Sequence, residues 1–163
     1  MWLDDAARPA VHGLKYGALP RIAADLAAAM LAMRPATDGP SVLIPIPLAK
    51  KRLRERGYNQ SEMLARALAR QWRIPVLVDV LVRTRETPTQ TALTPDTRLA
   101  NVAGAFSPRH RRGVGLPCGT LVLVDDVFTT GATLAEAARA LEQAGATKVR
   151  GVTFARAAIP DFT

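Results

Sequence analysis

The segment 121–133, which reads LVLVDDVFTTGAT, limits the fold of this chain more than any other stretch of its sequence. Its first four residues are all Leu or Val, which is typical of a strand buried on both faces of a parallel sheet. Asp125 and Asp126 follow directly, so we expect both carboxylates at the exposed carboxyl end of that strand. Because open α/β sheets bind ligands at the carboxyl ends of their strands, the segment predicts a ligand site there.

A short turn rich in hydroxyl groups follows the two carboxylates. The residues of this turn are Thr129, Thr130, Gly131, Ala132 and Thr133. Their backbone N–H groups and three hydroxyls suit an anion, and Gly131 allows the backbone to close tightly around it. Thr133 and Glu136 have the spacing of an N-terminal capping box, so a helix should begin here with its positive end toward the turn. The segment therefore predicts a sugar-phosphate site, whereas the simpler interpretation is a strand end followed by a plain turn.

A second basic loop, expected at 45–58, follows a short predicted strand at 42–44. It carries five cations, prolines that stiffen the exit from the strand, and Gly57, which permits an unusual backbone angle or close ligand approach. A helix is expected at 61–71, with Asn59 and Glu62 in capping-box register, so its N–H groups also point toward this loop. The residues we assign to anion binding here are Lys50, Lys51, Arg54, Arg56 and Gly57. The alternative is a basic surface loop ahead of a capped helix.

A third stretch, at 84–98, starts without apolar periodicity and is longer than most connections that lack secondary structure. We interpret it as a flexible lid, because long loops of this kind often carry function. Arg83, Arg85 and Arg98 could follow a phosphate or pyrophosphate into the closed site. The alternative is a disordered connection.

The rest of the chain predicts alternating helices and strands in one domain over residues 1–163. We expect a helix at 21–33, strands at 78–83 and 149–155, a short segment at 101–106 and a surface loop at 107–119. Such alternation favours a parallel sheet with right-handed crossovers. No apolar stretch approaches the ~20 residues that a membrane helix needs, so we expect no membrane insertion.

The net charge of +8 favours polyanionic partners such as phosphorylated sugars, pyrophosphate or nucleic acid. The basic cluster in the loop at 107–119 could touch nucleic acid, or it could simply be solvated. Cys118 is the only cysteine, so no disulfide or Cys-based zinc site can form within the chain. A reducing, cytoplasmic setting is therefore expected.

Taken together, these motifs resemble the type I phosphoribosyltransferases, and in particular their ComF/GntX-like branch. The resemblance rests on PIPL followed by RGYNQ, on the Arg-x-Arg-x-Thr-x-x-Gln pattern, and on DDVFTTGAT, and it covers nearly the whole chain. The early segment 11–17, VHGLKYG, is similar to a Leu-Lys-Tyr signature of that branch, although it is equally a loop that packs one aromatic ring on the core.

The resemblance implies an open parallel sheet flanked by helices that binds phosphoribosyl diphosphate (PRPP) with Mg²⁺. By position, Asp125 and Asp126 would contact the ribose hydroxyls, the turn 129–133 would hold the 5′-phosphate, and the basic loop would bind pyrophosphate. Thr129 stands where some purine-using members carry a carboxylate, so acid/base help from that position is not expected. Mg²⁺ takes its ligands largely from substrate oxygens, so no dedicated metal residues are assigned.

Two functions remain open at this point. The first is an enzyme in which an unidentified acceptor displaces pyrophosphate at ribose C1. The second is a non-catalytic, PRPP-binding competence protein that acts in DNA uptake with single-stranded DNA or a helicase partner, and a homodimer is left open for both. Members of this branch usually carry an N-terminal four-cysteine zinc module, which this sequence lacks, so we expect a truncated chain or a shortened gene.

Overall fold

The structure, a computed structural model, describes residues 2–3, 7–17, 20–86, 102–109 and 115–157. Its helices are α1 (Ala7–Tyr16), α2 (Pro20–Ala29), the 3₁₀ helix η1 (Leu31–Met33), α3 (Lys50–Arg56), α4 (Gln60–Trp72) and α6 (Ala132–Gln143). Its strands are β1 (Ser41–Pro45), β2 (Leu81–Arg83), β3 (Phe106–Pro108), β4 (Thr120–Phe128) and β5 (Lys148–Arg156). Among these residues, no helix has both the length and the apolar character that crossing a membrane requires.

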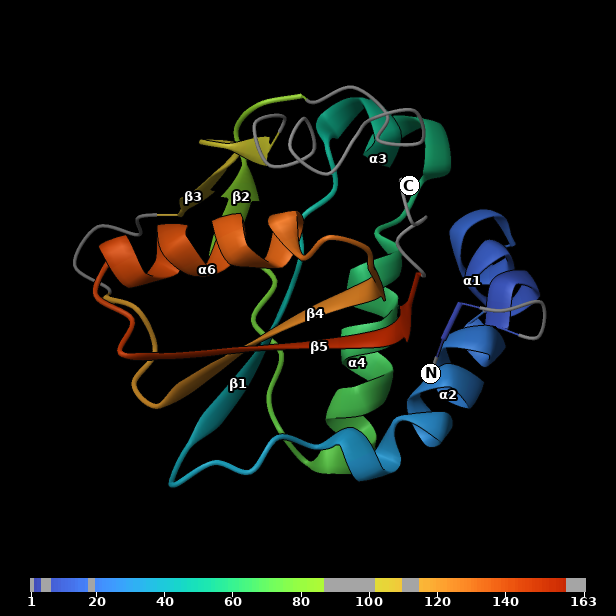
Figure 1. Ribbon diagram of the computed structural model, residues 1–163, viewed down its shortest axis with the longest axis horizontal. Helices are drawn as coiled ribbons and strands as arrows, with labels where there is room; N and C mark the ends of the chain where they lie inside the picture. The colour runs from blue at the N-terminus through green and yellow to red at the C-terminus, as the bar shows by residue number, and fades with distance from the viewer. Residues whose placement is uncertain (1, 4–6, 18–19, 87–101, 110–114, 158–163) are drawn as a thin grey trace, which may run out of the picture.

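A parallel sheet with the strand order β1-β4-β5 lies at the centre of the molecule (Figure 1). β4 pairs in parallel with both neighbours, so that Val122 lies between Leu43 of β1 and Arg150 of β5. Parallel neighbours need crossover connections, and helices supply them here. β2 and β3 form a separate antiparallel ribbon. The expected fold class, an open parallel sheet flanked by helices, is confirmed.

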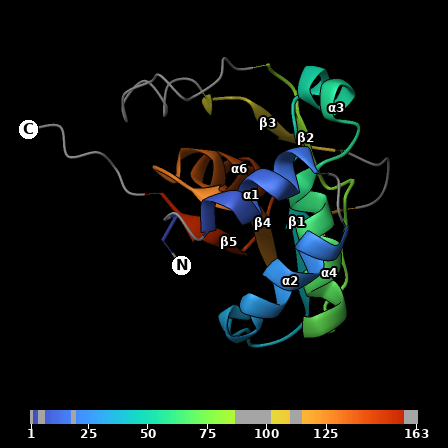
Figure 2. The ribbon, with the colours of Figure 1, turned by 90° about the vertical axis from the view of Figure 1, so that its right-hand side faces the viewer.

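Helices cover both faces of this sheet. α4, α2 and α1 lie on one side and α6 lies on the other (Figures 1 and 2). Val122 and Val124 belong to the core cluster shared with α4, whereas Leu121 and Leu123 belong to the cluster shared with α6. Each of the four side chains is at most 1% exposed. β4 is therefore buried on both faces, as its run of apolar residues predicts.

The expected basic loop at 45–58 is wrong in one respect, because its cations lie on a short helix. α3 spans Lys50–Arg56 and ends at Gly57, whose φ of 80° is the left-handed angle common after helices. Most of its residues are good helix formers. Periodicity did not reveal the helix because α3 has no apolar face, and its single leucine, Leu53, is exposed.

Several other boundaries differ from the expected ones. The helix expected at 21–33 ends at Ala29 and is followed by η1, and the strand expected at 78–83 is confined to β2. The segment around Leu14 is helical rather than a loop, since Val11 and Leu14 pack into the core on successive turns of α1. At α4 the expected cap is half confirmed: the Asn59 side chain accepts a hydrogen bond from the backbone N–H of Ser61, whereas Glu62 pairs with Arg66 instead.

Leu64→Ala is expected to lower the free energy of unfolding by about 2–5 kcal/mol, because Leu64 is fully buried between α4 and the sheet. Leu53→Ala is the matched control, and its effect should stay within about 0.5 kcal/mol. Urea denaturation of both variants provides the measurement. Equal effects of the two substitutions would contradict the packing described here.

Candidate functional site

The acidic pair lies where β4 has lost one of its two neighbours. The last residue of β1, Pro45, pairs with Val124 of β4. The pairing of the two strands therefore stops one residue before Asp125. β4 itself continues to Phe128, because β5 keeps pairing with it beyond the two carboxylates. The expectation that the strand ends at the acidic pair is therefore wrong, although the pair does lie at the carboxyl edge of the sheet on the β1 side.

Asp125 is held by two hydrogen bonds to one of its carboxylate oxygens. The Ser61 hydroxyl donates to Asp125 Oδ1 over 2.8 Å, and the backbone N–H of Asp126 donates to the same atom over 2.9 Å. Burial, followed by the negative charge of Asp126, raises the pKa of Asp125 to about 7, while the Ser61 hydrogen bond works against this rise. Asp125 can therefore gain or lose a proton near neutral pH.

Asp126 is buried, which is a correction to the expectation that both carboxylates are exposed. Its relative exposure is 5%, and its Oδ2 lies 2.9 Å from Nζ of Lys15 in an ion pair. Lys15 comes from the last turn of α1, which covers this part of β4. Sequence reasoning missed both Lys15 and Ser61 as site residues. The only signal for Lys15 was its place in the Leu-Lys-Tyr segment.

The turn after β4 is built around Gly131, which is the N-cap of α6 with a φ of 81°. A Cβ at this position would lie 2.8 Å from the ring of Phe128, so both the backbone angle and the space require glycine. Thr129, Thr130 and Thr133 are partly exposed, whereas Ala132 is buried. The turn thus presents hydroxyls and N–H groups at the N-terminus of a long helix, as expected for an anion site.

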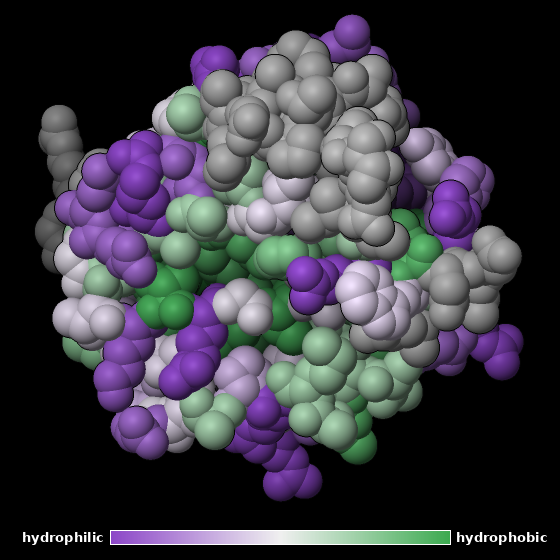
Figure 3. Space-filling view, in the orientation of Figure 1, coloured by the Kyte–Doolittle hydropathy of each residue, from purple (hydrophilic) through white to green (hydrophobic). Residues whose placement is uncertain are grey.

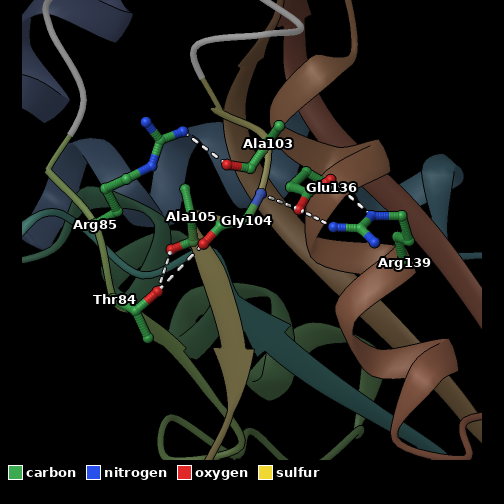
Figure 4. Close-up of polar contacts among 7 residues, drawn as sticks. All are labelled: Thr84, Arg85, Ala103, Gly104, Ala105, Glu136 and Arg139. Atoms are coloured by element: carbon green, nitrogen blue, oxygen red, sulfur yellow. Dashed lines mark hydrogen bonds and ion pairs between the residues drawn. The ribbon is translucent and has the colours of Figure 1, made fainter.

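The capping box predicted for Thr133 and Glu136 is wrong. α6 begins at Ala132, so Thr133 lies inside the first turn and is not the N-cap. The Thr130 hydroxyl instead accepts a 3.4 Å hydrogen bond from the backbone N–H of Ala132. Glu136 instead accepts a 2.6 Å hydrogen bond from the backbone N–H of Gly104 and pairs with Arg139 (Figure 4). The hydrogen bond from Arg139 lowers the pKa of Glu136. This carboxylate therefore ties α6 to the segment that precedes β3.

The basic residues expected to bind pyrophosphate divide into two groups. Lys50, Lys51 and Arg54 are exposed on α3, whereas Arg56 is engaged with its neighbours. The Arg56 guanidinium donates to Gln60 Oε1 over 2.6 Å and lies 5.3 Å from the ring centroid of Tyr16. Gly57 ends the helix. Lys50, Lys51 and Arg54 thus face solvent on a helix that follows β1 in the chain.

Only the base of the expected lid falls within the described residues, and Arg98 lies outside them together with residues 87–97. Thr84 and Arg85 on one side of that base donate to the backbone carbonyls of Gly104, Ala105 and Ala103 on the other side (Figure 4). Glu86 accepts a 3.1 Å hydrogen bond from the backbone N–H of Lys51. Residues 84–85 and 103–105 are therefore hydrogen-bonded to each other. The first of these stretches is also followed by Glu86, which contacts α3.

Arg83 lies at the end of β2, where its guanidinium is 5.3 Å from the ring centroid of Phe106 on β3. Burial, followed by the charge of Arg52, lowers the pKa of Arg83, whereas Asp125 raises it. Arg83 of β2 and Asp125 of β4, both predicted from the sequence, are therefore near enough to affect each other electrostatically.

A groove of about 500 Å³ lies between α6 and β5 and borders the turn 129–133. Its lining includes Thr130 and Gly131 but is otherwise mostly apolar. Figure 3 shows hydrophobic residues gathered around a hollow near the middle of the α6 face. Neither Asp125 nor Asp126 lines this groove, so charge and hydrogen-bonding groups, rather than the shape of the cavity, locate the candidate site.

Mg²⁺ fits this donor set only in part. Within the described ranges, no group of three or more His, Cys, Asp or Glu side chains could hold a metal ion. The adjacent carboxylates of Asp125 and Asp126 could support Mg²⁺ only if a bound phosphate supplied most of the oxygens, which is the usual way that Mg²⁺ binds.

Comparison with known proteins adds a family and a fold. A family model described as phosphoribosyl transferase domain matches residues 58–160. Competence protein F of Haemophilus influenzae is 37% identical over 118 residues, which cover 72% of this chain and 51% of that protein. The DNA utilization protein YhgH of Escherichia coli K12 is 35% identical over 150 residues, covering 87% of this chain and 63% of that protein. The chain thus spans less than two thirds of the length of these relatives.

The fold is also that of a solved enzyme. Glutamine PRPP amidotransferase from B. subtilis superposes with a TM-score of 0.53 at 21% identity, covering 88% of this chain and 30% of that chain. At this level of identity the likeness concerns the fold alone.

The raised pKa of Asp125 predicts that the unliganded protein loses stability as the pH rises. The stabilising effect of the protonated carboxyl is fully present below its ordinary pKa of 3.8 and is lost as the pH passes about 7. We expect a loss on the order of 2 kcal/mol between about pH 5 and pH 7.5. Asp125→Asn removes this titration, so urea denaturation should show that wild type loses stability relative to the variant over this range. A difference that stays constant with pH would contradict the prediction.

Proposed function

The chain belongs to the phosphoribosyltransferase family, in the branch that includes Competence protein F, and from that premise we propose that it binds Mg²⁺-PRPP and transfers the phosphoribosyl group to an acceptor. The observation that carries this proposal is the order of groups along β4 and α6. An acidic pair at the edge of the sheet is followed directly by a glycine-capped turn at a helix N-terminus. The hydroxyls on C2 and C3 of ribose and the phosphate on C5 of the same sugar need these two kinds of group side by side.

Each part of PRPP has a complementary partner in the structure. The ribose hydroxyls would donate to Asp125, and the 5′-phosphate would accept from the N–H groups and hydroxyls of the turn 129–133. The pyrophosphate would lie toward Lys50, Lys51 and Arg54, and Arg83, which feels the charge of Asp125, would be a further cation for it. All of these cations have side chains long enough to follow a flexible polyanion.

The chemistry that this arrangement supports is displacement at ribose C1. A nucleophilic atom of the acceptor forms a bond to C1 while the C1–O bond to pyrophosphate breaks, and any proton on that atom is released. Negative charge grows on the departing pyrophosphate, so the cations of α3 and β2 stabilise the transition state more than the ground state. When bound with PRPP, Mg²⁺ supplies further positive charge to the same phosphate oxygens.

A second function is favoured by the relatives and by the charge of the chain. Two relatives carry the names Competence protein F and DNA utilization protein, and the chain has a net charge of +8. In this alternative the protein is a cytoplasmic module of DNA uptake that binds single-stranded DNA or a helicase partner, and PRPP is a ligand without turnover. PRPP binding is common to both proposals, so the two differ in catalysis and in the acceptor.

Mg²⁺-PRPP is expected to stabilise the wild-type protein by ~2.7 kcal/mol at a hundredfold excess over its Kd. Asp125→Asn should weaken the affinity by about one to two orders of magnitude, because a hydrogen bond to a charged acceptor contributes about 1.5–3 kcal/mol. Asp38→Asn, which alters a carboxylate with 95% exposure, is the control and should bind like wild type. Titration calorimetry gives the three affinities, and wild-type affinity in Asp125→Asn would refute the ribose assignment.

A separate assay distinguishes the enzyme from the binding module. Pyrophosphate release from PRPP is measured with a panel of nucleobases and amines as acceptors. Turnover above the rate without acceptor supports the enzyme, whereas tight binding with no turnover supports the module.

If the chain binds single-stranded DNA, its affinity should fall steeply with salt, by ~0.7 in the log–log slope for each phosphate contacted. Replacing Lys50, Lys51 and Arg54 together with Gln should make the slope shallower by about 2. The control replaces Lys148 and Arg150, two exposed cations on β5, and should leave the slope unchanged. An unchanged slope in the first variant would direct attention to Arg109 and to Arg111 and Arg112, which lie outside the described residues.

A further inference from the structure

The last turn of α1 touches two parts of the proposed PRPP site that lie far apart in the sequence. Lys15 Nζ is 2.9 Å from Asp126 Oδ2 on β4. One residue earlier, the backbone carbonyl of Leu14 accepts a 2.9 Å hydrogen bond from the Tyr58 hydroxyl, just after α3. Figure 2 shows α1 passing in front of β4, with α3 above it. α1 lies outside the region that the family model matches, so the match assigns it no function.

A third contact joins the same turn of α1 to the basic helix. The Arg56 guanidinium lies 5.3 Å from the ring centroid of Tyr16, within the range of a cation–π interaction. Leu14, Lys15 and Tyr16 thus make one contact each with the site, through a carbonyl, an ammonium and a ring. Core packing accounts for only one of these residues, because Leu14 is fully buried whereas Tyr16 is exposed.

Asp126 needs a cation because of where it lies. Its side chain is 6% exposed, and a second carboxylate, Asp125, precedes it in the chain. An ionised carboxylate removed from water is very unfavourable unless it is paired. Lys15 supplies the pairing charge, and it occupies only one of the two carboxylate oxygens.

The form of the carboxylate matters for a sugar ligand. Ribose hydroxyls donate hydrogen bonds, and an ionised carboxylate accepts them better than a protonated one. Through its contact with Oδ2, Lys15 fixes the orientation of the carboxylate. The Lys15 side chain is itself 30% exposed, so its ammonium is within reach of the space beside the carboxylate.

We propose that Lys15 is a positioning residue of the PRPP site, which pairs with Asp126 and orients it for the ribose, and that the last turn of α1 is a working part of this site. The proposal rests on the function proposed above. It makes α1 more than a cover for the core, because without Lys15 the carboxylate of Asp126 would lose its ion pair.

The test compares Lys15→Met, which keeps an unbranched side chain of similar length but removes the charge, with Lys15→Arg, which keeps the charge. Lys148→Met is the matched control, because Lys148, the first residue of β5, also forms an ion pair, at 3.7 Å from Asp38 on the surface. Calorimetry measures the affinities for Mg²⁺-PRPP, ribose 5-phosphate and Mg²⁺-pyrophosphate. Thermal melting checks that each variant is folded.

We expect Lys15→Met to weaken binding of the two ribose-containing ligands by about tenfold or more. Its affinity for pyrophosphate should stay within about twofold of wild type, and Lys15→Arg should recover at least half of the lost binding energy. Lys148→Met should match wild type with all three ligands. Equal losses for pyrophosphate and for ribose 5-phosphate would show that Lys15 acts as a general attractor of anions, and would overturn the proposal.

A double-mutant cycle tests whether Lys15 acts through Asp126. If it does, Lys15→Met combined with Asp126→Asn should bind PRPP no more weakly than Asp126→Asn alone. Multiplied losses would contradict this. The double variant carries no unpaired buried charge, so the comparison remains decisive even if Lys15→Met alone does not fold.

The outcomes also separate this inference from the function on which it rests. A wild-type protein that binds no PRPP would remove both. A wild-type protein that binds PRPP, with unchanged affinity in Lys15→Met, would remove only the role of Lys15.

Discussion

The burial of β4 on both faces and along both edges is the constraint on which the rest of the structure depends. A strand in this position can carry charged side chains only where a neighbouring strand ends. The pairing of β1 with β4 stops at Val124, one residue before Asp125. Beyond that point every polar group needs its own partner, and Ser61 and Lys15 supply partners from two different helices. The location of the site therefore follows from the lengths of the strands, because the shorter β1 exposes the end of the longer β4.

The site combines carboxylates that are costly to bury with cations that are mostly exposed. Asp125 responds to burial by a raised pKa, whereas Asp126 is matched by a lysine. On the other side, Lys50, Lys51 and Arg54 project from α3 into solvent. A polyanionic ligand placed between these groups would neutralise the exposed cations and would satisfy the buried acceptors. Such a ligand would thus link the exposed cations of α3 to the buried carboxylates of β4.

Sequence patterns predicted the features that depend on neighbouring residues. The buried run of β4, the glycine turn before α6 and the cap at Asn59 all follow from local composition. The contacts of Lys15 and Glu136 could not be predicted in this way, because each side chain bonds to a residue far along the chain. α3 escaped notice for a different reason: it is a short helix without an apolar face, so periodicity carried no information about it.

The pairing of β1 with β4 has a consequence for how the protein folds. Ser41 of β1 lies beside Thr120 of β4, so nearly half the length of the chain separates two strands that hydrogen-bond to each other. Contacts of such high contact order form slowly, since a large loop must close before any bond repays the lost entropy. During synthesis β1 and α4 leave the ribosome before β4, so the part of their apolar surface that packs against β4 has no native partner until that strand emerges. The strand that carries the acidic pair is therefore also the one that completes the core.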